Sequence, residues 1–255
     1  MQNVLAIWQR EMKSYFVSPI AYVVLTVFLF LSGIFFSSML FMYVQYAMQG
    51  QMSGQAQPID IPWLVCRNFF GTMSVVLLFM IPMLTMGLFA EEKKRGTMEL
   101  LLTTPVGNFQ AMMGKYLASL TFFGILLGAT MVTISPLFLW GQPDWKPILG
   151  GYLGLFLYGA AVLAVGLFIS TLTENQIIAV SVTFGISLIF WLTEAFAGSA
   201  EGVTKDLLSY LSVIGHLDDF LKGVIDSSSV IYYATFAFVG LFLTYRSLES
   251  TRWKS

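Results

Sequence analysis

The residues that could do chemistry in this chain are few, and they do not form a known catalytic set. His216 is the only histidine and precedes Asp218 and Asp219, but one histidine with two nearby acids falls short of the ligand sets of zinc sites. We interpret His216 as a packed or solvated loop residue. Gly114-Lys115 lacks the upstream glycine and the following Ser or Thr of a phosphate-binding loop. The sequence therefore predicts no metal site, no bound cofactor and no ATP hydrolysis by this chain itself.

Two further side chains that could react or ionise, a thiol and a carboxyl, lie in or next to apolar stretches. Cys66 is the only cysteine, which excludes an intrachain disulfide, and we interpret it as a core thiol. Glu194 is the one clearly ionisable residue in the expected membrane interior, where a charge costs about 2.5–3.5 kcal/mol. Because it falls near the outer end of its stretch, it can be an interfacial or neutral hydrogen-bonded carboxyl. The alternative is a place on a substrate path.

The composition identifies the solvent that these residues meet. Of the 255 residues, 57% are hydrophobic and only 11% are charged, whereas a soluble domain carries roughly 25% charged residues. So little polar surface cannot cover a soluble globule, and the sequence predicts an integral membrane protein. The net charge of −1 gives no basic stripe, so we expect no nucleic-acid partner.

Six apolar stretches are long enough to cross a bilayer, at 19–44, 67–90, 113–140, 147–170, 176–197 and 229–246. Residues 1–18 are different, because Val4, Leu5, Trp8 and Met12 share one side at helical spacing. They predict an amphipathic helix in the membrane surface, with a short helix of the soluble type as the alternative. The expected fold is all-α, one membrane domain over 1–255.

The distribution of basic residues predicts the orientation. Nine of the 13 Lys and Arg residues fall on one side of the expected spans, so that side is cytoplasmic and both termini lie inside. Residues 1–18 and the loop 91–112 are then cytoplasmic, and the flexible connection 45–66 and the loop 198–228 are outside. Small residues at Gly124, Gly128, Gly150 and Gly154 favour close helix packing, within the chain or between subunits. Prolines Pro82 and Pro136 predict kinks.

The most informative stretch is the cytoplasmic run Glu91–Pro105, which reads EEKKRGTMELLLTTP. Gly96 is expected to end one helix and Thr97 to begin another. Met98–Leu102 then form a short helix with a large apolar face, which ends at Pro105. That face must be buried, either by lipid headgroups or by a groove on a partner protein.

This run resembles the cytoplasmic loop of permeases in the type-2 ABC exporter family. The family pattern has an acidic pair, a G-T-x-E-x-L-L core and a closing proline. The matching residues are Glu91, Glu92, Gly96, Thr97, Glu99, Leu101, Leu102 and Pro105. The resemblance implies that this loop, with Met98 and Leu100 on the same helix, forms the coupling helix that docks into an ATPase subunit. Thr173, Glu174 and Asn175 stand where the family makes a second cytoplasmic contact, although a plain capped turn would also suit them.

The resemblance implies a bacterial inner-membrane exporter with two permeases and two ATPase subunits that bind the ATP and magnesium. The second permease can be an identical or a related chain. The segments Ser18–Tyr22 and His216–Asp226 are similar to the gliding-motility-type subgroup. That similarity keeps open a second function, a membrane platform that passes ATP-driven motion to a periplasmic partner without transport. A polytopic membrane enzyme using His216 or Asp219 is a third.

Overall fold

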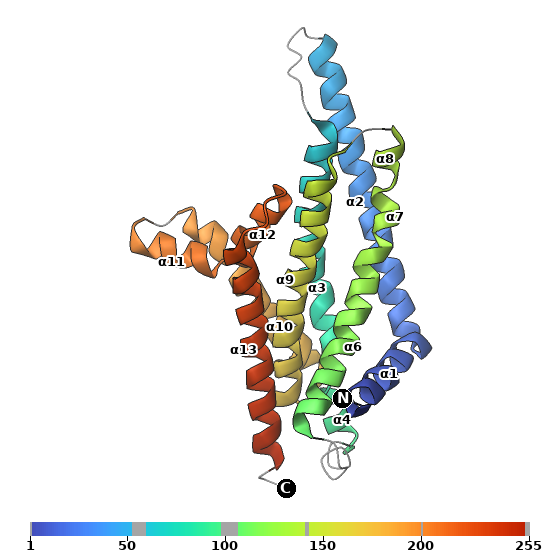
Figure 1. The fold of residues 1–255 in the computed structure, drawn as a ribbon, viewed down its shortest axis with the longest axis vertical. Coiled ribbons are helices and arrows are strands. Elements are labelled where there is room, and N and C mark those ends of the chain that lie inside the picture. The colour runs from blue at the N-terminus through green and yellow to red at the C-terminus, as the bar shows by residue number, and fades with distance from the viewer. Residues whose placement is uncertain (1, 53–59, 98–106, 141–142, 200, 253–255) are drawn as a thin grey trace.

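The computed structural model describes residues 2–52, 60–97, 107–140, 143–199 and 201–252. Within these ranges every regular element is a helix, and six helical stretches are long and apolar enough to cross a membrane. Figure 1 shows the long helices side by side in one elongated bundle, with α1 and α4 at one end. We call this the α4 end. The opposite end of the bundle, where α11 and α12 connect α10 to α13, is called the α11 end.

The first two helices follow each other directly at the α4 end, and the second extends beyond the predicted first span. Helix α1, Gln2–Val17, lies across the α4 end against α6, and α2, Pro19–Met52, follows at once. With 34 residues, α2 is about 51 Å long, well beyond a hydrocarbon core of about 30 Å. The prediction of a flexible connection over 45–66 is wrong for residues 45–52 and 61–66, which are helical. Helix α2 continues to Met52 and α3 begins at Ile61, where the Asp60 side chain accepts from the Trp63 amide.

The second and third spans each consist of more than one helix, and the interruptions lie after Thr85, at Thr130 and directly before Pro136. Helix α3, Ile61–Thr85, contains Pro82 and ends three residues later, before the short α4, Ala90–Lys94. The third span consists of α6, Asn108–Ala129, α7, Met131–Ile134, and α8, Pro136–Trp140. The helix is interrupted at Ser135, directly before Pro136, where a kink was predicted, because proline cannot donate to the preceding turn.

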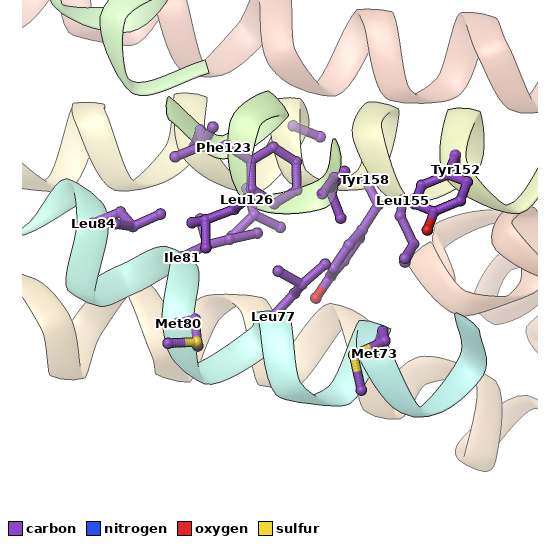
Figure 2. Close-up of a cluster of buried hydrophobic side chains, with 14 of the residues drawn as sticks. Met73, Leu77, Met80, Ile81, Leu84, Phe123, Leu126, Tyr152, Leu155 and Tyr158 are labelled. Atoms are coloured by element: carbon purple, nitrogen blue, oxygen red, sulfur yellow. The ribbon is translucent and has the colours of Figure 1, made fainter. Parts of the chain in front are cut away.

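Helix α9, Trp145–Leu172, is the centre of the bundle. It contacts α3, α6, α10 (Gln176–Ala197) and α13 (Ser227–Arg252). Figure 2 shows apolar side chains from α3, α6 and α9 that meet in this core, among them Ile81, Phe123 and Tyr158. Helices α2, α10 and α13 bury a much smaller share of their apolar residues inside the chain than α3 and α9 do. Lipid or another protein must cover these outer helices.

Two short helices follow α10 at the α11 end. Helix α11, Val203–Leu211, projects sideways from the bundle, whereas α12, Val213–Leu221, packs on α9. A Cβ added at Gly154 would lie 2.8 Å from both Leu217 and Phe220. The Gly150–Gly154 pair is therefore used inside the chain, where it lets α12 approach α9 closely.

Candidate functional site

The charge run that follows the second span folds into a short segment after α3, residues 86–97, which we call the α4 segment. Glu91 and Glu92 begin α4, Lys93 and Lys94 end it, and this order suits the helix dipole. Gly96 has a φ of +68°, a left-handed conformation that glycine adopts without strain. Gly96 thus ends α4 as predicted. The Thr97 hydroxyl and amide both donate to the Glu92 carbonyl and close the helix end.

A buried serine on α9 holds the start of the α4 segment. The Ser170 hydroxyl oxygen accepts from the amides of Phe89 and Ala90, at 2.9 and 3.0 Å, and donates to the Met86 carbonyl. All three of Ser170, Phe89 and Ala90 are fully buried. One side chain therefore satisfies backbone groups on both sides of the turn between α3 and α4. In the same region, the Lys93 ammonium donates to the Thr171 carbonyl.

The α4 segment also meets the start of α10. The Gln176 amide donates to Glu91 at 3.4 Å, and Arg95 pairs with the same carboxylate. The connection Thr173–Asn175 is a capped turn in which the Asn175 side chain accepts from the Ile177 amide. Glu174 and Asn175 are exposed. The structure thus brings the two predicted cytoplasmic contacts, Glu91–Thr97 and Thr173–Asn175, to one place on the surface.

Glu92 faces inward rather than towards a partner. Its carboxylate lies 2.9 Å from the ammonium of Lys115 on α6 and 3.1 Å from the guanidinium of Arg10 on α1. Glu11 completes the group, 3.1 Å from Lys115 and 2.8 Å from Arg10. We call Arg10, Glu11, Glu92 and Lys115 the charge cluster. Lys115 is buried and the two carboxylates are largely buried, whereas the Arg10 side chain is 56% exposed. The two positive and two negative charges balance, and this pairing offsets part of the cost of taking Lys115 and the carboxylates out of water.

The contacts within the charge cluster shift the pKa values of Glu11 and Arg10, which both lie on α1. Burial alone would raise the pKa of Glu11, but the charge of Lys115 and hydrogen bonds from Arg10 and Lys115 outweigh it, so this pKa lies below its usual value. Bonding to Glu11 and the nearby charge of Glu92 raise the pKa of Arg10. Both groups therefore stay ionised at neutral pH.

Lys115 was not predicted as a site residue. It was counted among the cytoplasmic charges, and Glu194 was the one clear ionisable group expected in the membrane interior. A lysine inside the apolar stretch 113–140 is itself the signal, because such a residue requires an acidic partner. The partners, Glu11 and Glu92, are distant in sequence and could not be chosen from spacing.

The predicted coupling helix itself falls outside the described residues. Its members are Met98, Glu99, Leu100, Leu101 and Leu102, and the closing Pro105 is outside them too. The structure describes the chain on both sides, up to Thr97 and again from Gly107, where α6 begins.

At the α11 end, the candidate residues do not converge on one site. The His216 ring stacks on Tyr232 with centroids 4.0 Å apart, and its Nδ1 lies 2.8 Å from the Ser212 carbonyl. Asp218 pairs instead with Arg67 and Lys222, whose hydrogen bonds hold its pKa low despite burial. Among the described residues no group of three His, Cys, Asp or Glu could hold a metal ion.

Glu194 lies three residues before the end of α10 and is exposed. Its carboxylate reaches towards α12, where a Cβ added at Gly215 would lie 2.8 Å from it. This position fits an interfacial carboxyl near the helix end, as the sequence suggested. The role of Glu194 on a substrate path stays a prediction.

Six helices long and apolar enough to span a membrane, a charge cluster around Lys115 and two inter-helix connections that meet at the α4 end define a polytopic membrane protein. Residues 66–217 match the protein-family model described as ABC-2 family transporter protein, which covers more than half of the chain. The chain belongs to this family of ABC transporter membrane components. Comparison with curated proteins finds no match. The matched residues include the α4 segment and the turn before α10.

Proposed function

We propose that this chain is the permease subunit of an ATP-driven exporter in a bacterial inner membrane, with its α4 end and both termini in the cytoplasm. ATP and magnesium are bound by a separate ATPase subunit, present in two copies, and this chain binds neither. A second permease, identical or related, completes the transporter. The observation that carries the proposal is the bonding of the α4 segment to α9 and α10 through Ser170, Lys93 and Gln176.

The mechanism follows from that bonding. A loop that is hydrogen-bonded to two spans transmits a push to them, whereas a loosely tethered loop would absorb it. When ATP closes the ATPase pair, the α4 segment and the Thr173–Asn175 turn move together and carry the ends of α9 and α10 with them. The permease then shifts between two states with different access. The substrate path lies between the two permeases, where α2 and α10 leave apolar surface uncovered.

The first test is to tag the chain, solubilise it gently and identify proteins that accompany it in stoichiometric amounts. We expect a P-loop ATPase and a second permease. Leu101→Asp should remove the ATPase. The matched control, Leu207→Asp, places the same charge on the exposed side of α11 and should keep it. Recovery of the chain with no ATPase would refute the proposal.

The subgroup is tested by what the ATPase cycle does. The similarity of Ser18–Tyr22 and His216–Asp226 to the gliding-motility-type subgroup supports a place in that subgroup. Transport of a substrate into inside-out vesicles, dependent on ATP, would establish an exporter. An ATPase cycle with no substrate, together with a periplasmic protein bound to residues 198–228, would instead indicate the membrane platform.

A further inference from the structure

Lys115 is a charged side chain in a place where packing alone would favour an apolar one. Its side chain is 2% exposed, although it stands in the first half of the membrane-spanning helix α6. A buried ammonium is costly unless it is paired and hydrogen-bonded. Lys115 meets that requirement with one carboxylate from α1, Glu11, and one from α4, Glu92. Both carboxylates come from helices at the α4 end of the bundle.

The neighbouring residue shows that α1 is seated closely at this point. A Cβ added at Gly114 would lie 2.7 Å from Ile7 and 3.2 Å from the Val4 carbonyl. Only glycine therefore allows α1 to come this close to α6. The contact continues along α6, where Trp8 donates to the Thr121 hydroxyl at 3.1 Å. Gly114 provides the room for α1, and Lys115 provides its charge pairing.

The arrangement around Lys115 joins three elements through one atom. The ammonium Nζ lies 3.1 Å from Glu11 and 2.9 Å from Glu92, and Arg10 pairs with the same oxygen, Oε1, of each carboxylate. The Phe89 ring, 5.2 Å away, closes the site towards the α3–α4 turn. Without the Lys115 charge, two half-buried carboxylates would face each other with only Arg10 to balance them.

We propose that Lys115 is a positioning residue, which holds α1 and the α4 segment in one fixed relation so that α1 moves with the segment. The source of the movement rests on the proposed function, but the attachment of α1 does not. Helix α1 is then a part of the unit that an ATPase displaces, in addition to any contact it makes with lipid. Since α2 follows α1 after one residue, the displacement reaches the first span as well.

The attachment is tested without any partner protein. In a Cys66→Ala background, Asn3→Cys and Gln110→Cys replace two side chains that are hydrogen-bonded at 3.0 Å between α1 and α6. A short thiol–thiol crosslinker should join them efficiently. Adding Lys115→Met should slow crosslinking at least about tenfold, because breaking a buried ion pair from one side is strongly destabilising. Lys13→Met, an exposed lysine of α1, is the matched control and should change nothing.

A second variant keeps the test decisive if Lys115→Met does not insert. Glu11→Gln keeps the size of the side chain and removes the charge that faces Lys115, so crosslinking should again slow. Crosslinking at the control rate in Lys115→Met, or in Glu11→Gln where Lys115→Met is not recovered, would overturn the proposal.

The joint movement is tested in the purified complex with its ATPase. A fluorophore on Leu5→Cys, an exposed position of α1, should change its emission when ATP is added. Glu92→Gln should reduce that change while leaving α1–α6 crosslinking intact, because Glu11 still binds Lys115. An unchanged signal in Glu92→Gln would overturn the joint movement. If no ATPase is recovered at all, the proposed function fails, while the crosslinking result still decides how α1 is held.

Discussion

Ser170→Ala is the perturbation that most directly tests how the α4 segment is held. The change removes one hydroxyl from a fully buried side chain and leaves the amides of Phe89 and Ala90 without their acceptor. Each buried donor left unsatisfied costs about 1–3 kcal/mol. Two donors that share one lost acceptor give about 2–4 kcal/mol, which shifts the opening equilibrium of the segment about 30- to 700-fold.

Hydrogen–deuterium exchange of the purified protein measures this opening. Peptides that contain residues 86–95 should exchange faster in Ser170→Ala by a factor in that range, while peptides from α6 and α9 keep their rates. Ser74→Ala is the matched control. Ser74 is equally buried on α3, but its hydroxyl donates to the carbonyl of Gly71 in its own helix. Equal exchange of residues 86–95 in both variants would refute the anchoring role of Ser170.

Four other changes test separate parts of the structure. Gly96→Pro cannot reach a φ of +68°, since proline fixes φ near about −65°; it should abolish substrate-dependent ATPase activity while membrane insertion stays normal, and unchanged ATPase activity would contradict the role of this turn. Gly154→Ala should lower the Tm in detergent, at a cost of about 1–3 kcal/mol from overpacking against α12, whereas Gly128→Ala, which meets nothing within 4 Å, should not. Tyr158→Phe should be neutral or stabilising in the same assay, because its buried hydroxyl has no hydrogen-bond partner among the described residues; a marked loss of stability would reveal a partner. The lowered pKa of Glu11 means that its ionised form stabilises the attachment of α1 above the ordinary carboxyl value of about 4.3 and loses that effect as the pH falls through the lowered pKa; the ratio of α1–α6 crosslinking rates between the parent and Glu11→Gln, in which the pH dependence of the thiol reaction cancels, should thus be constant from about pH 8 to 5, and a ratio that already changes at pH 6 would oppose this assignment.

The number and order of the spans could be predicted because length and apolarity alone decide them. A run of about 20 apolar residues has few alternatives to a membrane helix. The ends were less predictable. Residues 45–52 looked like a flexible connection from their Gln and Gly content, yet α2 continues through them to Met52. Polar composition indicates where a chain leaves the hydrocarbon core of the membrane. The end of a helix is set instead by the last backbone hydrogen bond of the helical pattern.

The candidate site was predictable in its residue types and not in its partners. Glu91 and Glu92 were expected to act together in coupling, but they face different ways. Glu91 meets Arg95 and Gln176 at the surface, and Glu92 meets Lys115 inside. Two acids adjacent on a helix point about 100° apart, so adjacency itself argues against a shared partner. Which buried cation the inward one would meet depends on how α6 packs, and sequence spacing does not give that.

The two connections at the α4 end are better understood as one mechanical unit than as two contacts. Lys93 bonds to the Thr171 carbonyl, and the Thr171 hydroxyl in turn donates to Ser247 of α13 at 2.8 Å. Ser170, next in the chain, holds the α3–α4 turn. Because α9 is a continuous helix at the centre of the bundle, a force on this unit acts at the end of a helix that contacts α3, α6, α10, α12 and α13. In the proposed transporter, a partner that displaces the α4 segment would therefore act on α3, α9 and α13 together.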